Sequence, residues 1–308
     1  MTEGTGWAVL VLPLALTAFA LLALAADAAV GVRVAHARRS VAAAAADPWR
    51  EVARLLVGQR RTTVAADGVL WRSGVVTVPL AALLAALVLP LGGFAAADPG
   101  VGIVWFNAME ILGWAALWTA GWGPNSPLSL IGGYRFVAQG MCYELPHMFA
   151  LITAATGAGT LRVGGIVDAQ AELWFVVWMP VAFVVYLISA AAMAFWGPFD
   201  APLGRDLSGG VVAELSGVDR LVLLTGRWLL VVVAAGMAVP LFLGGGRGPL
   251  LPAWLWTLVK TALVLTFLLW SRRRFPTVRM ERFTEVSWLV LLPLTILQAL
   301  LVALVVLV

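Results

Sequence analysis

The stretch Gly132–Met148, Gly-Gly-Tyr-Arg-Phe-Val-Ala-Gln-Gly-Met-Cys-Tyr-Glu-Leu-Pro-His-Met, places ionisable side chains at the mouth of, or inside, an apolar segment. Glu144 and His147 are three residues apart and share one face of the expected helix. Pro146 between them frees a backbone carbonyl one turn back. Because ionisable groups in a bilayer helix are costly unless they face a polar cavity or a partner, the stretch predicts a membrane helix that lines a polar path.

The same stretch has a second polar face. Arg135, Gln139 and Tyr143 recur every four residues and therefore lie one above the other on the helix. Arg135 is either an anchor at the membrane surface or a partner for a buried acid. Glu144 is expected to serve the path and not merely to form a structural pair. For His147, a proton-carrying role and a simple hydrogen bond to a backbone carbonyl both stay open.

Composition indicates a polytopic membrane protein. Hydrophobic residues make up 62% of the 308 positions and charged residues 12%, against about 25% charged in a soluble domain. The single cysteine excludes a disulfide framework, and two distant histidines make a metal site unexpected. No phosphate-binding loop or metalloprotease motif occurs. We therefore expect no metal, no flavin and no nucleic acid on this chain, and interpret its basic balance as membrane topology.

Eight apolar segments are each near the ~20 residues that cross a bilayer core. All are expected to be helices, because lipid cannot satisfy open backbone polar groups. The predicted spans are 7–29, 74–96, 101–120, 137–157, 173–195, 220–243, 251–270 and 286–307. The predicted fold class is all-α: one integral membrane domain over residues 1–308 with about eight transmembrane helices.

The arginines predict the orientation. The arginine-rich loops are 30–73, 121–136, 196–219 and 271–285. The alternate loops contain only Arg162 and Arg247. By the positive-inside rule the first set faces the cytoplasm and both termini face outward. We expect a multi-pass protein of a bacterial inner (plasma) membrane.

The first arginine-rich loop is predicted to contain an amphipathic helix over about 48–58. Asp47 is the expected N-cap and Pro48 the first helical residue. Four side chains follow helical spacing on one apolar side: Trp49, Val52, Ala53 and Leu56. Such a helix lies on the membrane surface or across neighbouring spans.

Two further charged residues lie near the middle of predicted spans. Glu110 is in the span 101–120, and Lys260 is in the span 251–270, too deep for its ammonium to reach the surface easily. They form either an ion pair or separate stations of a polar axis, and the second interpretation is favoured slightly.

Three blocks of the chain resemble one known family. The first consists of Asp98, Gly102, Gly113, Gly121-Trp122, Asn125, Gly132, Arg135, Ala138-Gln139 and Tyr143-Glu144-Leu145-Pro146. The second consists of Pro198-Phe199-Asp200-Ala201-Pro202 and Glu214-Leu215-Ser216-Gly217. The third consists of Trp270, Arg272, Pro276, Arg279, Glu281, Phe283, Trp288 and Leu291-Leu292-Pro293, with Lys260 at a family lysine. Together they resemble the H subunit of bacterial NADH-quinone oxidoreductase (the first mitochondrially encoded subunit of respiratory complex I), in a superfamily shared with membrane subunits of energy-converting hydrogenases and formate hydrogenlyase.

The resemblance implies a membrane subunit of a complex I-like oxidoreductase. Such a subunit forms the quinone-side cavity, couples electron transfer to proton translocation and has no catalytic residue or activity of its own. Ubiquinone or menaquinone would be the substrate, and the partners would be the lipid bilayer and other membrane and iron–sulfur subunits. The candidate quinone-cavity residues are Asp27, Arg33, Asp200, Glu214 and Arg279. The candidate proton-path residues are Glu110, Arg135, Tyr143, Glu144, His147 and Lys260.

The chain also departs from the family on its cytoplasmic side. The Glu-Arg-Lys motif after the first span is echoed only by Asp27, Val30 and Arg33. The family's Ala-Glu-Thr-Asn-Arg is replaced by residues 192–196, and its acidic cluster after Pro202 is replaced by Leu-Gly-Arg-Asp. A hydrogenase-type or diverged subunit that serves as ion path and docking platform without quinone chemistry is therefore the alternative. A stand-alone secondary transporter is a further one, against which the lack of an internal repeat counts.

Overall fold

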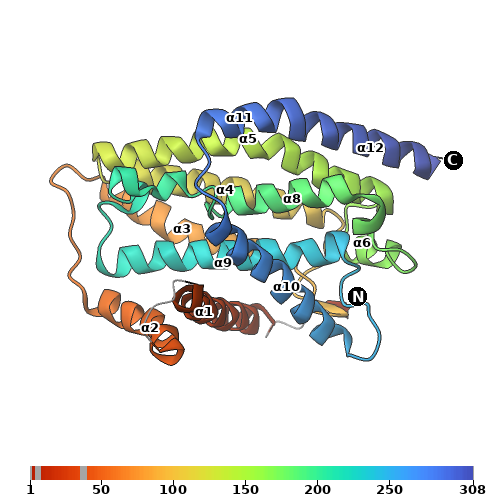
Figure 1. Ribbon diagram of the computed structural model, residues 1–308, viewed down its shortest axis with the longest axis horizontal. Coiled ribbons are helices and arrows are strands. Elements are labelled where there is room, and N and C mark those ends of the chain that lie inside the picture. The colour runs from red at the N-terminus through yellow and green to blue at the C-terminus, as the bar shows by residue number, and fades with distance from the viewer. Residues whose placement is uncertain (1, 4–7, 35–39, 308) are drawn as a thin grey trace.

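The computed structural model describes residues 2–3, 8–34 and 40–307, and most of this part of the chain is helical (Figure 1). The first helices are α1 (Ala8–Val34), α2 (Val41–Val57), α3 (Gly68–Ala86), α4 (Gly102–Trp122), α5 (Pro127–Ala158) and α6 (Val163–Ala169). They are followed by α7 (Phe175–Trp178), α8 (Pro180–Met193), α9 (Gly217–Phe242), α10 (Ala253–Arg274), α11 (Met280–Val286) and α12 (Leu292–Leu307). Short helical turns are η1 (Ala201–Leu203), η2 (Arg205–Leu207), η3 (Gly210–Val212) and the π-helix η4 (Ser287–Leu291). The two-residue strands β1 (Thr2–Glu3) and β2 (Phe94–Ala95) pair in parallel.

The polytopic all-α fold is confirmed. Within the described ranges, six helical segments are long and apolar enough to cross a membrane, and α5 with α6, bent by 60° at their junction, makes a seventh. The expected span 173–195 is divided instead into α7 and α8. The division falls at Pro180, which has no backbone N–H to continue the hydrogen-bond ladder. Helix α8 alone has only 14 residues.

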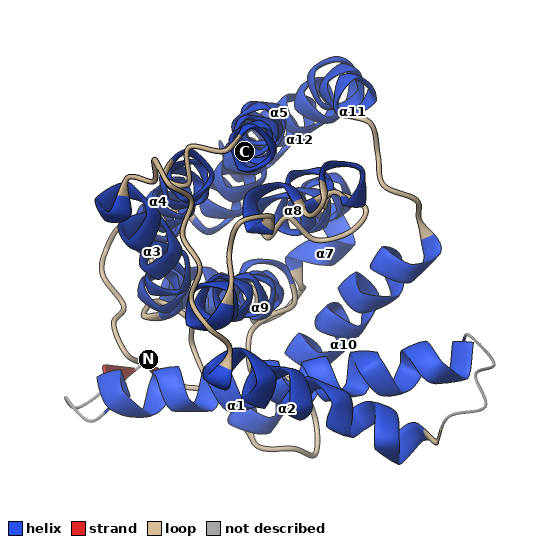
Figure 2. Ribbon diagram, turned by 90° about the vertical axis from the view of Figure 1, so that its left-hand side faces the viewer, coloured by secondary structure: helices blue, strands red, loops and turns tan. Residues whose placement is uncertain are grey.

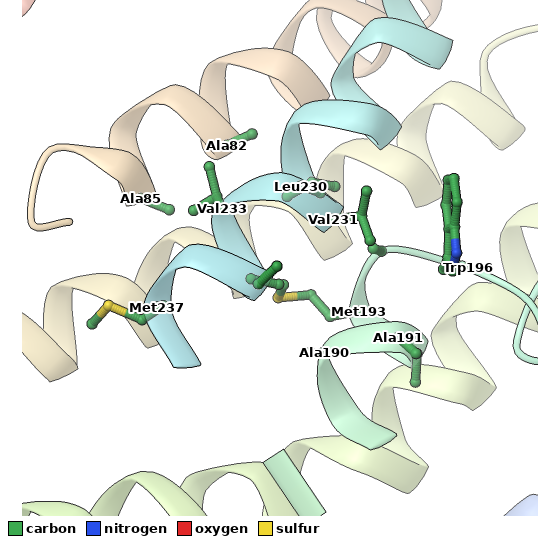
Figure 3. Close-up of a cluster of buried hydrophobic side chains, with 14 of the residues drawn as sticks. Ala82, Ala85, Ala190, Ala191, Met193, Trp196, Leu230, Val231, Val233 and Met237 are labelled. Carbon is green, nitrogen blue, oxygen red and sulfur yellow. The ribbon is translucent and has the colours of Figure 1, made fainter. Parts of the chain in front are cut away.

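Helix α9 is the centre of the bundle. It packs on α3, α8 and α10, and it is the most buried of the six long apolar segments. Figure 3 shows its side chains Leu230 and Val233 facing Ala82 and Ala85 of α3, with Met193 of α8 near by. Small alanines let the helix backbones approach closely, which is how membrane helices gain packing contacts.

The amphipathic helix is longer than predicted, and the predicted cap is wrong. Helix α2 begins at Val41, and its N-cap is Ser40, whose Oγ accepts from the Ala43 N–H at 3.2 Å. Pro48 lies inside the helix. The alanine run before Asp47 has the highest helix propensity, and it extends the helix backwards through the expected boundary.

The inward face of α2 also differs from the expectation. Ala44, Pro48 and Leu55 are buried, whereas Trp49 and Leu56 are 50% and 57% exposed. The apolar side that the spacing predicted therefore points away from the helices that the structure describes, toward the surroundings of the protein.

The four arginine-rich loops meet at one end of the bundle, called here the arginine-rich end. They follow α1, α4, α8 and α10. In Figure 1 the segment between α2 and α3 and the loops after α4 and α8 lie at the left, and the loop after α10 lies closer to the middle. The strand β1 and the last turn of α12 lie toward the opposite side (Figure 1). The alternation of loops between two ends agrees with a chain that crosses a membrane repeatedly. Viewed from that left-hand side, α3, α4, α5 and α9 are seen nearly end-on, whereas α1, α2 and α10 lie across the view (Figure 2).

Candidate functional site: a buried acid–histidine cluster and a charged cavity

A carboxylate and an imidazole meet in the interior between α4 and α5. Oε2 of Glu110 lies 3.0 Å from Nε2 of His147, and the two residues are 3% and 0% exposed. The orientation is not that of a hydrogen bond. Both carboxylate oxygens and both ring nitrogens lack a hydrogen-bond partner among the described residues. Buried polar groups are normally hydrogen-bonded, and an exception is often found at a site with a catalytic or redox role.

A second carboxylate adjoins this pair. Glu144 lies one turn before His147 on α5, and its Oε1 accepts from Nδ2 of Asn107 on α4 at 3.3 Å. Asn107 is one turn before Glu110. Two acids, one imidazole and one amide are thus supplied by two packed helices, an arrangement that can hold and pass a proton.

Aromatic side chains enclose the cluster. The ring of Tyr186 on α8 lies 5.2 Å from the His147 ring, and Phe106 lies 6.4 Å from it on another side. Tyr186 donates its hydroxyl to the carbonyl oxygen of Ala234 on α9, at 2.8 Å. Tyr143 is also buried. Low polarity around the acids strengthens every charge interaction among them.

The carbonyl freed by Pro146 has a partner. Pro146 lies inside α5, so the oxygen of Cys142 receives no helical hydrogen bond from it. The Ser287 hydroxyl donates to this oxygen from η4. The proline therefore joins α5 to the last span at the level of Glu144 and His147.

A charged cavity of about 790 Å³ lies at the arginine-rich end. It is formed by the start of α5, the segment after α8, one turn of α9, the end of α10 and the segment before α11. Its lining residues are Arg135, Asp200, Ala201, Leu203, Gly204, Asp206, Arg227, Arg272, Thr277, Val278, Arg279, Met280 and Glu281.

One wall of the cavity is an ion pair. Arg135 donates from Nη1 and Nη2 to the two carboxylate oxygens of Asp206, at 3.1 and 2.8 Å. This hydrogen-bonded pair lowers the pKa of Asp206 below its usual value. Asp200 accepts instead from the Thr277 hydroxyl at 3.0 Å.

The inner wall consists of two guanidinium groups over one indole. The Cζ atoms of Arg227 and Arg272 lie 4.9 and 4.7 Å from the centre of a Trp196 ring. Nη2 of Arg227 donates to the Phe195 oxygen at 2.7 Å, and its Nε has no acceptor among the described residues. Trp196 is fully buried and donates to the Leu268 oxygen.

The predicted quinone-cavity residues separate in the structure. Asp200 and Arg279 line the cavity. Asp27 on α1 is not among the lining residues; it pairs with Arg272, which lines the cavity, and with Arg273 of α10. Glu214 accepts from the Ser126 hydroxyl at 2.7 Å. Arg33 is in α1, and its side chain lies outside the described part of the protein.

The predicted path residues separate as well. Glu110, Tyr143, Glu144 and His147 are buried or half-buried on α4 and α5, whereas Arg135 belongs to the charged cavity. Gln139, on the same face of α5, donates to the oxygens of Ala192 and Phe199 and holds the turn after α8.

Lys260 is not paired with Glu110. Its ammonium donates to three carbonyl oxygens at the far end of α9, those of Leu243, Gly245 and Arg247, at 2.6, 2.9 and 2.7 Å. It also lies 4.0 Å from the centre of a Trp174 ring. The ion-pair alternative is therefore wrong.

Sequence reasoning missed Asn107, Tyr186 and Arg227. Tyr186 is one of only three tyrosines, and Arg227 is a basic residue inside a predicted span, so both carried a signal. Asn107 carried a weaker one. No group of three metal-ligating side chains occurs in the described ranges.

The family model described as NADH dehydrogenase matches residues 6–303. The chain is 33% identical to an H subunit (number 2) of the NADH-quinone oxidoreductase of Geobacter sulfurreducens over 264 residues, which cover 82% of this chain and 80% of the relative. It is 32% identical to the H subunit (number 1) of Geobacter metallireducens over the same shares, and 34% identical to that of Rhodopseudomonas palustris (number 1) over 70% of this chain and 67% of that one. An integral membrane protein with these matches belongs to the NADH dehydrogenase family, and the relatives that it resembles are H subunits of NADH-quinone oxidoreductases.

Proposed function

We propose that the chain forms the quinone-side cavity of a complex I-like NADH-quinone oxidoreductase and couples electron transfer to proton translocation. The observation that carries the proposal is the Glu110–His147 pair, which is buried, 3.0 Å apart and without hydrogen-bond partners in the described structure. Relatives named as subunits of such an enzyme support the assignment to this complex. The oxidoreductase reaction would belong to the assembly, with iron–sulfur and other membrane subunits as partners.

The proposed coupling is electrostatic. Arrival of an electron near the charged cavity changes the local charge, and neighbouring carboxylates respond by taking up or releasing protons. Glu144, His147 and Glu110 would carry these protons, because the packing of α4 on α5 gathers them in one buried cluster. Tyr143 and Tyr186 are buried in the same region, and the Tyr186 ring contacts His147. The arginine-rich end would face the cytoplasm of a bacterium, with both termini outside.

Purification of the tagged chain from its native membrane, followed by mass spectrometry and a quinone-reductase assay, tests this function. Iron–sulfur and antiporter-like subunits should accompany the chain, and quinone reduction should fall when Glu144→Gln is introduced. Glu172→Gln is the matched control, since Glu172 lies in the exposed segment between α6 and α7. The same partners without quinone reduction would favour the ion path and docking platform, and a chain that purifies alone would favour a transporter.

A further inference from the structure

The charged cavity contains a buried cation, Arg227, that forms no ion pair with a carboxylate of the described residues. Arg227 is 8% exposed and has no acid within ion-pair distance among the described residues. It lies ten residues after Gly217, the first residue of α9, or about 15 Å along the helix at ~1.5 Å per residue. A buried guanidinium without a counter-charge is costly unless the site brings one.

The neighbouring acids are engaged elsewhere. Asp206 binds Arg135 at 2.8 Å on the cavity wall. Asp27 lies 3.5 Å from Arg272 but 2.7 Å from Arg273, which shares it. Asp200 accepts from Thr277 and, like Glu281 of the same lining, forms no ion pair among the described residues. At the inner wall the guanidinium groups of Arg227 and Arg272 meet over Trp196. The described carboxylate within ion-pair distance there is Asp27, which binds Arg272 and is shared with Arg273.

The hydrogen-bonding capacity of Arg227 is also incomplete. Nη2 is occupied by the Phe195 carbonyl, while Nε has no acceptor among the described residues. A guanidinium presents its donors in a fixed fork that matches an anionic oxygen. The cavity volume of about 790 Å³ is ample for a bicyclic aromatic ring.

We propose that Arg227, supported by Arg272, binds the anionic oxygen of a quinone-type ring in this cavity, so that the site prefers the negatively charged form of its ligand over the neutral one. A quinone that gains an electron before a proton carries such an oxygen. This inference rests on the proposed function and identifies the ligand form and the residue that selects it. Arg227 acts here by binding the ligand, and the proton path is not involved.

The preference can be measured with two matched ligands. The full chain in nanodiscs is titrated with 2-hydroxy-1,4-naphthoquinone, whose hydroxyl is ionised at neutral pH, and with the neutral 2-methyl-1,4-naphthoquinone. Binding to the unmodified chain should be roughly tenfold tighter for the anion, the size expected of one charge-assisted contact. Added salt should weaken binding of the anionic naphthoquinone and leave binding of the neutral one unchanged.

Substitutions then test which residue causes the preference for the anionic ligand. Arg227→Gln should abolish the tenfold ratio and Arg227→Lys should restore part of it, because lysine keeps the charge but not the fork. Arg274→Gln is the matched control, since Arg274 lies at the same end but outside the cavity lining. Arg279→Gln, at an exposed cavity position, should lower the ratio partly and does not depend on folding of the interior.

Equal or weaker binding of the anion by the unmodified chain overturns the inference, as does an unchanged ratio in a folded Arg227→Gln protein. Failure of the proposed function looks different. In that case neither naphthoquinone binds, and the purified assembly does not reduce quinone. If the assembly reduces quinone but the chain binds both naphthoquinones equally well, the proposed function stands and the proposed role of Arg227 is wrong.

Discussion

His147 and Glu110 face each other at 3.0 Å from two different helices, and neither is accessible to solvent. The negative charge of the buried Glu110 carboxylate is removed when Glu110 binds a proton, and it is balanced when His147 is an imidazolium. Either state places one exchangeable proton between α4 and α5. The protonation of this pair therefore depends on how α4 packs on α5, and the packing in turn depends on the charge of the pair.

Glu110→Gln should uncouple the assembly. The amide keeps the size of the side chain but cannot accept a proton, and positioned proton transfer typically contributes about 10²–10⁴-fold. We expect proton translocation per quinone reduced to fall at least tenfold, measured with a pH-sensitive dye in proteoliposomes. The variant Glu285→Gln, at an exposed position paired with Arg282, should pump normally. Normal pumping by Glu110→Gln would exclude the pair from the path.

Ser287→Ala should destabilise the junction of α5 with the last span. The change leaves the Cys142 carbonyl without a donor, at a cost of about 1–3 kcal/mol. Thermal unfolding in detergent should show the loss. In a Pro146→Ala background the backbone N–H at position 146 can serve the same carbonyl, so Ser287→Ala should cost less there. Equal costs in both backgrounds would contradict the link between the proline and the serine.

Lys260→Met should loosen the far end of α9. The side chain has similar length but cannot donate to the oxygens of Leu243, Gly245 and Arg247. We expect a loss of about 2–4 kcal/mol from these unpaired groups, seen as a lowered unfolding temperature. Lys260→Arg should recover part of it. If Lys260→Met is as stable as the parent yet fails to pump, the ammonium serves proton transfer and not the end of α9.

The Arg135–Asp206 pair should respond to acid in a defined direction. Its pairing lowers the pKa of Asp206, so its stabilising contribution is present above the ordinary pKa of an aspartate and is lost as the pH falls through the lowered value. Asp206→Asn should therefore reduce stability at pH 7 and make no difference at a pH well below 4. Because Asp206 is 63% exposed, the effect at pH 7 should be below about 1 kcal/mol. Chemical unfolding at both pH values measures it, and a larger effect in acid would contradict the pairing.

The sequence alone determined the membrane class and nearly all of the spans. Hydropathy over ~20 residues is a local property, and it predicted the long helices whatever their neighbours. It also predicted that Pro146 frees a carbonyl, since a missing N–H acts within one helical turn. The local sequence did not determine where α2 begins, because the alanine run before Asp47 and the Asp47-Pro48 pair both signal a helix start.

Only the tertiary structure decided which polar groups meet. Glu110 and His147 are distant in sequence, and Arg135 and Tyr143 share a helix face yet serve different regions. The spacing along a helix gives the direction of a side chain but not the element that it faces. The partners of Lys260 are carbonyls at the end of another helix, and those of Arg227 are an indole and a cavity. Such contacts arise when separate helices pack, because the interior must satisfy its polar groups with whatever packing brings near.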